Sequence, residues 1–171
     1  KACGICGSDL HFAAHGAEML DAMADIEGLP SMSGELSLDR DVFMGHEFCA
    51  EVLAAGPGTD THPAGTLVTS VPVLLSSTGV EMLVYTNDAV AGYAEKMLLS
   101  APLLLPVPNG LAATHAALTE PMAVGLHAVN TSRVERGHTA LVIGCGPIGI
   151  AIIAALRLRG VETIVASDFS P

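Results

Sequence analysis

The residues best equipped for chemistry begin at the third position of the chain, in the stretch Cys-Gly-Ile-Cys-Gly-Ser-Asp-Leu-His at 3–11. It brings thiol, hydroxyl, carboxylate and imidazole groups together, and its two glycines permit a tight backbone. A second polar cluster is Gly45-His46-Glu47, and a third is Thr119-Glu120-Pro121. A cysteine, a histidine and a carboxylate that are far apart in sequence make a three-ligand set for a catalytic zinc, which leaves the fourth position for water or substrate. We therefore expect the rest of the chain to assemble a metal site.

The composition bounds the class of protein. Half of the 171 residues are hydrophobic and there is no tryptophan, which favours packed α/β layers around a sizeable core. The net charge is −11, with 18 acidic residues against 7 basic ones. Nucleic acids and anionic membranes both require a basic surface, so we expect neither as a partner.

The four cysteines are Cys3, Cys6, Cys49 and Cys145. We see no secretory leader, so we expect reduced thiols in a cytoplasmic protein. The Cys3-x-x-Cys6 pair could also be a redox pair or half of a structural zinc site. A structural site would require a second such pair, which the sequence lacks, and the pattern after Cys6 is not that of a thioredoxin-like unit.

The first part of the chain alternates between turns and short apolar runs. The spacing of apolar residues predicts an amphipathic helix over 13–26, followed by a polar loop to Asp41. We expect strands over 42–52 (carrying His46 and Glu47), 65–72, 91–98 and 103–107, with an irregular segment over 73–87. Several short strands with regular turn signals indicate a small β-rich, partly barrel-like domain.

The texture of the sequence changes near residue 111. A helical composition over 112–130 is interrupted at Glu120-Pro121, and a strand over 140–143, a helix over 150–159 and a strand over 162–167 follow. The segment 139–156 is almost uncharged, but its central glycines and proline divide it into a strand and a helix, which excludes a membrane span.

A glycine-rich turn joins that strand to that helix, in the pattern Gly144-x-Gly146-x-x-Gly149. In this context the first glycine makes the tight turn, the second admits a pyrophosphate close to the backbone, and the third allows close helix packing. The helix N-terminus favours phosphate groups. Asp168, at the end of the next strand, is placed to accept hydrogen bonds from ribose hydroxyls, which favours NAD over NADP. The expected cofactor-binding residues are Gly144, Gly146, Pro147, Ile148, Gly149 and Asp168.

Taken together, the motifs resemble those of the zinc-dependent medium-chain alcohol dehydrogenases. The similarity rests on residues 4–11, Gly45-His46-Glu47, Gly92-Tyr93-Ala94-Glu95, residues 120–124 and the glycine-rich turn, in that order. The Glu120-Pro121 form is most similar to the polyol (sorbitol-like) and threonine dehydrogenase branches. The resemblance implies a β-rich GroES-like catalytic domain over 1–118, followed over 119–171 by the start of an α/β Rossmann NAD-binding domain.

The resemblance also implies roles for individual residues. Cys6, His46 and Glu120 would be zinc ligands, and Glu47 would be a neighbouring carboxylate that helps to exchange the metal's water. Asp9 resembles the acid that orients the histidine ligand. Ser8 and His11 resemble the relay that carries the alcohol proton to solvent. The zinc would polarise the substrate oxygen while a hydride passes to NAD. The remaining histidines are expected to have no catalytic role: His15, His62, His115, His127 and His138.

This sequence also departs from the family pattern. The lobe with four closely spaced cysteines is missing, so we predict one catalytic zinc and no structural zinc. The stretch over 13–41 is longer than usual. The chain lacks the first strands of the catalytic domain and has two strands of a nucleotide-binding sheet that needs about six. We therefore expect a fragment of a longer enzyme.

The leading hypothesis is a zinc-dependent oxidoreductase that acts on a small alcohol or polyol with NAD and that forms a homo-oligomer when full length. One alternative is a non-catalytic zinc- or nucleotide-binding fragment. Another is a zinc-free quinone or enone reductase of the same superfamily, which would have no use for Cys6, His46 and Glu120.

Overall fold

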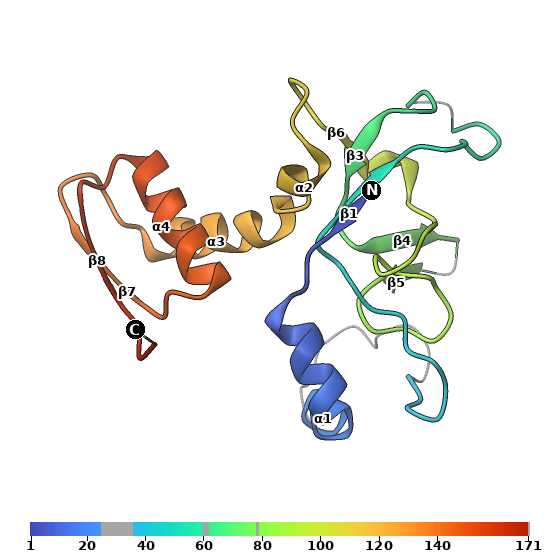
Figure 1. Ribbon diagram of the computed structural model, residues 1–171, viewed down its shortest axis with the longest axis horizontal. Helices are drawn as coiled ribbons and strands as arrows, with labels where there is room; N and C mark the ends of the chain where they lie inside the picture. The colour runs from blue at the N-terminus through green and yellow to red at the C-terminus, as the bar shows by residue number, and fades with distance from the viewer. Residues whose placement is uncertain (25–35, 60–61, 78, 171) are drawn as a thin grey trace. The chain divides into compact units, whose positions relative to one another are not determined.

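The computed structural model describes residues 1–24, 36–59, 62–77 and 79–170, except for the side chains of residues 23 and 24. The chain divides into two compact units, Lys1–Ala117 and Leu118–Pro171, which are drawn in Figure 1. Each unit is described by itself.

The first unit is built on a four-stranded antiparallel sheet. Its strands are β1 (Ala2–Cys3), β2 (Phe48–Glu51), β3 (Leu67–Thr69) and β6 (Leu105–Pro106), in the order β1-β2-β3-β6. In the register, Cys3 lies opposite Phe48 and Ala50 lies opposite Val68. The strands β4 (Val73–Ser76) and β5 (Gly79–Met82) form a separate hairpin, and η1 (Ala101–Leu103) is a short 3-10 helix before β6.

Two small apolar cores support this unit. One core contains Cys49 of β2 together with Ala116 and Ala117, which lie at the end of the short helix α2 (Ala113–Ala116). The other is centred on Leu83, which is completely buried, together with Ala89 and Ala91. The second core packs against Phe43, which lies in the segment before β2 that carries His46 and Glu47.

Helix α1 (Gly7–Ala24) begins six residues earlier than the expected start at residue 13 and bends at His15, where the backbone is not helical. Asp9 explains the early start, since it lies in the first turn and accepts a hydrogen bond from the Cys6 N–H, as the third residue of a capping box does. The expected end of the helix at residue 26 lies outside the described residues.

Other expectations for the first unit are also corrected. The strand predicted over 42–52 forms only as β2, so His46 and Glu47 precede it in a loop. The segment 73–87 is not irregular, because its first ten residues include the β4–β5 hairpin. The segment 91–98 is not a strand, because the N–H groups of Gly92 and Tyr93 donate to the carbonyl oxygens of Gly45 and Met44 instead of entering a ladder.

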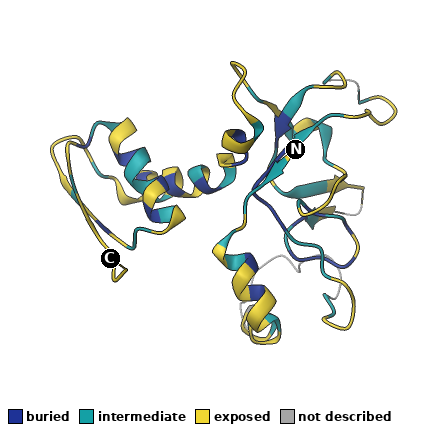
Figure 2. Ribbon diagram, viewed as in Figure 1, coloured by how far each residue is buried: buried dark blue, intermediate teal, exposed yellow. Residues whose placement is uncertain are grey.

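In the second unit, two helices pack beside a parallel pair of strands. These elements are α3 (Thr119–Ser132), β7 (Thr139–Ile143), α4 (Pro147–Arg159) and β8 (Thr163–Ser167). The buried residues of this second unit lie mainly along α3 and α4 (Figure 2). Val129, Val142 and Leu156 form the core together with Ala155 and Val161.

The predicted strand, helix and strand of this unit are confirmed as β7, α4 and β8, and the helix begins three residues earlier than expected. Pro147 is the first residue of α4, where its missing N–H costs nothing, and Gly160 ends the helix in the left-handed conformation. The helical stretch predicted over 112–130 is interrupted, but at residues 117–118, between α2 and α3, rather than at Glu120-Pro121. Glu120 and Pro121 lie in the first turn of α3, where proline is tolerated.

Within the described residues, no helix combines the length and the apolar character that crossing a membrane requires.

Candidate metal centre and nucleotide-binding turn

The start of α1 fixes the backbone around Cys6. The Cys6 carbonyl oxygen accepts the Asp9 N–H at 3.1 Å, and the Cys6 N–H donates to the Asp9 carboxylate oxygen Oδ2, also at 3.1 Å. These reciprocal bonds satisfy groups that the first turn of a helix otherwise leaves unpaired. Cys6 is half-buried, whereas Asp9 is only 2% exposed.

The loop before β2 carries His46 and Glu47, and both are buried, each with 7% of its surface exposed. Gly45 has a φ of +93°, a conformation that favours glycine. The Gly4 N–H donates to the Glu47 carbonyl oxygen at 2.7 Å, which ties this loop to the segment between β1 and α1.

These two segments bring Cys6, His46 and Glu47 together. One ligand atom from each residue lies within 4.8 Å of the others, close enough for a single ion to lie among them after small adjustments. The donor set is a thiol sulfur, an imidazole nitrogen and a carboxylate oxygen, which suits zinc among the common metals.

The surroundings of His46 provide a test of whether the site fits a metal. Its Nδ1 atom lies 3.5 Å from the Asp9 oxygen Oδ1, and both atoms are buried without a hydrogen-bond partner among the described residues. An imidazole backed by a carboxylate is the usual arrangement for a metal-ligating histidine, since the carboxylate orients the ring and fixes its tautomer. The residues present therefore fit a zinc ion.

The other predicted site residues of the first domain lie on α1. Ser8 is half-buried in the first turn, and His11, one turn later, is exposed. The His11 ring lies 5.0 Å from that of His15, between centroids. The relay role of Ser8 and His11 remains a prediction.

In the structure, Glu47 lies in the ligand group with Cys6 and His46. The family resemblance instead implied Glu120 as the third ligand. Glu120 lies in the first turn of α3, in the second unit. Its assignment as a zinc ligand also remains a prediction.

All four cysteines are free thiols. Burial raises the pKa of Cys3 to about 11, and nearby Asp9 and Glu47 add to the rise, while a backbone hydrogen bond with Glu47 opposes it. Burial also raises the pKa of Cys49. Because the thiolate is the reactive form, a raised pKa makes Cys3 a poor member of a redox pair at neutral pH.

In the second unit, the glycine-rich turn connects β7 to α4. Gly144 has a φ of +95°, and a side chain at Gly149 would collide with the Gly144 carbonyl oxygen, so the helix approaches the turn as closely as the motif requires. Pro147 and Ile148 form the first turn of α4. This end of the helix has the positive pole that suits a phosphate group.

Asp168 follows β8 and contacts the same turn. Its Oδ2 atom accepts the Cys145 N–H at 2.6 Å, and its Oδ1 atom accepts the Ser170 N–H at 2.8 Å. These backbone N–H groups lower the pKa of Asp168. Its predicted contact with a ribose is not tested by this arrangement.

The sequence motifs indicate no individual role for Tyr93 or Tyr85. The Tyr93 hydroxyl donates to the Asp9 oxygen Oδ2 at 2.7 Å, although the two residues are 84 positions apart. Tyr85 is buried, and its ring stacks on Phe12 of α1 with centroids 4.2 Å apart. The motif around Tyr93 was recognised, but nothing in its spacing indicates a contact with Asp9.

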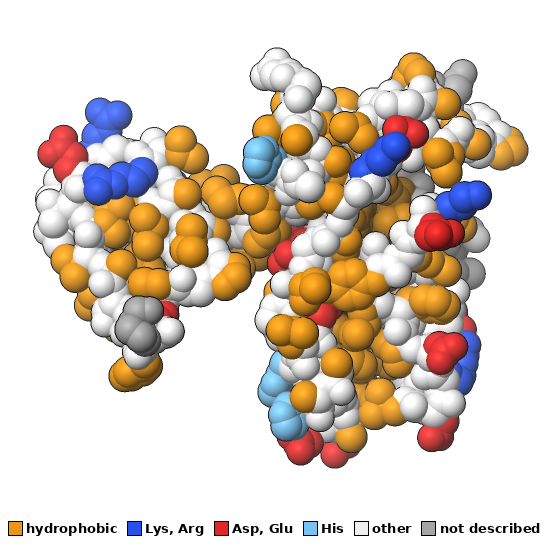
Figure 3. Space-filling view, in the orientation of Figure 1, with side chains coloured by type: hydrophobic (Ala, Val, Ile, Leu, Met, Phe, Trp, Pro, Cys, Tyr) orange, Lys and Arg blue, Asp and Glu red, His pale blue; other side chains and the backbone are white. Residues whose placement is uncertain are grey.

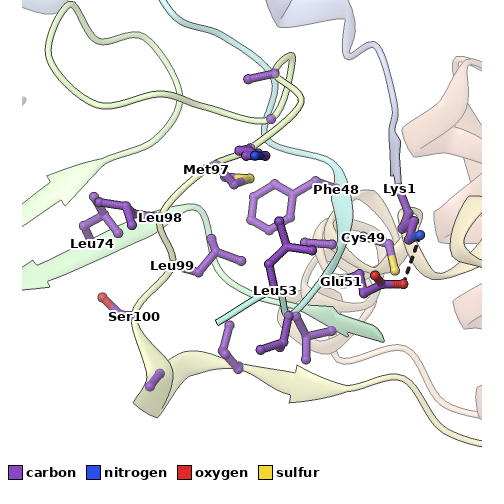
Figure 4. Close-up of a pocket in the computed structure, with 18 of the residues that line it drawn as sticks. Lys1, Phe48, Cys49, Glu51, Leu53, Leu74, Met97, Leu98, Leu99 and Ser100 are labelled. Carbon is purple, nitrogen blue, oxygen red and sulfur yellow. Dashed lines mark ion pairs between the residues drawn. The ribbon is translucent and has the colours of Figure 1, made fainter. Parts of the chain in front are cut away.

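A cavity of about 1120 Å³ opens in the first unit and is shown in Figure 4. Its labelled lining includes apolar side chains such as Phe48, Leu74 and Met97, and an ion pair between Lys1 and Glu51 lies at one side. None of the three clustered ligand residues lines it, so this cavity is distinct from the candidate metal site.

A β-domain with a Cys-His-Glu cluster and a strand–glycine turn–helix–strand unit in one chain define the class of zinc-dependent medium-chain dehydrogenases. Residues 1–109 match the family model of the alcohol dehydrogenase GroES-like domain. The chain belongs to this family, and its fold class, a GroES-like domain followed by the start of a Rossmann domain, is as the sequence predicted.

Two curated relatives of this chain are named as dehydrogenases of a diol and of a polyol. The chain is 34% identical to (R,R)-butanediol dehydrogenase of Bacillus subtilis, over 100% of this chain and 50% of that protein. It is 26% identical to sorbitol dehydrogenase of the same organism, over 99% of this chain and 47% of that protein. The chain thus spans about half the length of the curated relatives it matches.

Solved dehydrogenase structures also match this chain. The crystal structure of 2R,3R-butanediol dehydrogenase from Bacillus subtilis matches with a TM-score of 0.73 and 29% identity, covering 98% of this chain and 54% of that one. A candidate zinc-binding dehydrogenase from Sinorhizobium meliloti, bound to NADP, matches with a TM-score of 0.74 and 28% identity, covering 96% and 46%.

Proposed function

We propose that this chain belongs to a zinc-dependent dehydrogenase that transfers a hydride between a small alcohol or polyol and NAD. The observation that carries the proposal is the convergence of Cys6, His46 and Glu47, with their ligand atoms within 4.8 Å of one another. Their order along the chain follows the family motifs, and the butanediol and sorbitol dehydrogenases among the relatives indicate the substrate class.

Each residue of the site would have a separate role in this reaction. Cys6 and His46 would hold the metal, with a carboxylate from Glu47 or Glu120, while Asp9 keeps the His46 ring in place. When bound, zinc would supply a Lewis acid that polarises the substrate oxygen. Ser8 and His11, the latter exposed on the same helix, would together relay the hydroxyl proton to solvent.

The glycine-rich turn and the first turn of α4 would bind the pyrophosphate of NAD through backbone N–H groups and the helix dipole. Asp168 would accept hydrogen bonds from the ribose hydroxyls and repel a 2′-phosphate. We expect NAD to be preferred over NADP and the preference to shrink in an Asp168→Ser variant, measured as the ratio of the two dissociation constants. An equal preference in both proteins would contradict this role of Asp168.

We also propose that the whole protein acts in the cytoplasm, because its four cysteines are free thiols, and that it forms a homo-oligomer. Small-molecule substrates, rather than nucleic acids or membranes, suit its acidic composition. On the face of the first unit seen in Figure 3, lysine and arginine side chains are sparse among hydrophobic and acidic ones.

The first experiment compares the zinc content of the purified chain with that of Cys6→Ala and Cys145→Ala variants. We expect about one zinc per chain in the wild type and in Cys145→Ala, and a loss of zinc in Cys6→Ala. NADH formation with 2,3-butanediol and sorbitol then tests the activity. Zinc binding without turnover of either alcohol would favour the non-catalytic alternative, and the absence of zinc from folded wild-type protein would overturn the metal mechanism.

A further inference from the structure

The hydroxyl group of Tyr93 reaches Asp9, beside the candidate metal site. The residue as a whole is 43% exposed, yet its hydroxyl donates at 2.7 Å to Asp9, which is 2% exposed. Burial raises the pKa of Tyr93, and the charge and hydrogen bond of Asp9 raise it further, so the phenol remains a proton donor at neutral pH. The hydrogen bond joins a loop far along the chain to the first turn of α1.

Two glycines hold Tyr93 in this place. The Gly92 N–H donates to the Gly45 carbonyl oxygen at 2.7 Å, and the Tyr93 N–H donates to the Met44 carbonyl oxygen at 3.0 Å. A side chain at Gly45 would come within 2.6 Å of the Tyr93 ring. The ring is therefore packed on the backbone immediately before His46, and Tyr93 is fixed to the loop that carries this ligand.

Both hydrogen bonds to the Asp9 carboxylate are accepted by one of its oxygens. Oδ2 accepts both the Tyr93 hydroxyl and the Cys6 N–H. Oδ1 is left facing His46 Nδ1 at 3.5 Å, and neither of these buried atoms has a hydrogen-bond partner among the described residues. With Oδ2 held by two donors, the carboxylate cannot rotate away from the imidazole without breaking them.

We propose that Tyr93 is a positioning residue of the metal centre, whose hydroxyl holds the Asp9 carboxylate in the orientation that directs His46 toward the metal. The inference rests on the zinc site of the proposed function. In this scheme Tyr93 acts through Asp9. Removing its hydroxyl should therefore weaken metal binding by leaving Asp9 with one donor.

The test compares zinc affinities, measured by competition with a chromophoric chelator, of the wild-type chain and of Tyr93→Phe. Altering a group that holds a metal ligand in place typically weakens metal binding by about 10- to 100-fold. Because Tyr93 lies one step further out, we expect a loss near or somewhat below the lower end of this range. The control is Thr59→Val, which removes a hydroxyl that donates to the Gly56 carbonyl oxygen in an exposed turn. We expect the control to retain the wild-type affinity, and the visible spectrum of the cobalt-substituted protein to change only in Tyr93→Phe.

A second pair of variants distinguishes positioning through Asp9 from a general structural effect. In an Asp9→Asn background, Tyr93→Phe should cause little further loss of zinc affinity, because the group through which it acts is already altered. An undiminished further loss would overturn the inference, as would full affinity in either Tyr93→Phe or Asp9→Asn alone. If thermal unfolding shows that metal-free Tyr93→Phe does not fold, full zinc affinity in Asp9→Asn would still overturn the inference. If the wild-type chain binds no zinc, the proposed metal site fails as well, whereas tight wild-type binding with unaffected variants removes only the role of Tyr93.

Discussion

Gly4 and Glu47 are in direct contact, and the contact leaves no room for a side chain at Gly4. The Gly4 N–H donates to the Glu47 carbonyl oxygen at 2.7 Å, and a methyl group on Gly4 would overlap the Glu47 carboxylate oxygen Oε2. A glycine at this position therefore allows the carboxylate to lie in the ligand group with Cys6 and His46.

Gly4→Ala should displace the Glu47 carboxylate and weaken zinc binding by about 10-fold, on the scale seen when groups around a metal are disturbed. Gly7→Ala is the matched control, because a side chain there meets nothing within 4 Å. We expect it to change neither zinc affinity nor, by more than about 0.5 kcal/mol, the free energy of unfolding. Equal zinc affinities of the two variants would show that the contact does not matter for the site.

The two candidate carboxylate ligands can be separated by substitution. We expect Glu47→Gln to weaken zinc binding at least about 10-fold, since it removes the carboxylate that lies with Cys6 and His46. Glu51→Gln, which alters only the ion pair with Lys1, serves as the control. Zinc titrations of Glu120→Gln complete the set. If only this last variant loses zinc, the third ligand is Glu120 and Glu47 is a bystander.

The lowered pKa of Asp168 predicts a pH-dependent stability of the second unit. Because the carboxyl is more acidic in the folded chain than its ordinary value of 3.8, its contribution to stability is complete above that value. It is lost as the pH falls through the lower folded pKa. Thermal unfolding of the wild type and Asp168→Asn from pH 6 to pH 2 should show a difference that shrinks below about pH 4. A difference that does not vary with pH would contradict the prediction.

The contact between α3 and α4 depends on Gly125. A side chain there would lie 2.7 Å from the backbone carbon and Cβ of Ala151 in α4. Gly125→Ala should therefore force the helices apart and lower the free energy of unfolding by about 1–3 kcal/mol, the usual cost of overpacking. Gly137→Ala meets nothing within 4 Å and should be close to neutral in the same urea titration. Equal stabilities of the two variants would argue against close packing at Gly125.

Local sequence signals were sufficient to predict a strand, a helix and a strand of the second unit. An apolar run, a glycine-rich turn, Pro147 at the helix start and Gly160 at its end act within a few residues of one another, so β7, α4 and β8 could be predicted from the sequence. The residue types of a zinc site and the family they belong to were also recognisable, because cysteine, histidine and carboxylate in motif order have few other uses together.

Contacts between segments that are distant in sequence determined the fold of the first unit. The segment around Tyr93 has the composition of a strand, but its N–H groups donate to the loop at 44–45, which is distant in sequence. For the same reason, no spacing rule could show that Asp9 receives the Tyr93 hydroxyl or that Gly4 admits Glu47 beside Cys6. The sequence names the groups that can do the chemistry, but which carboxylate faces which ligand depends on packing between distant segments, and that is settled only when the chain is folded.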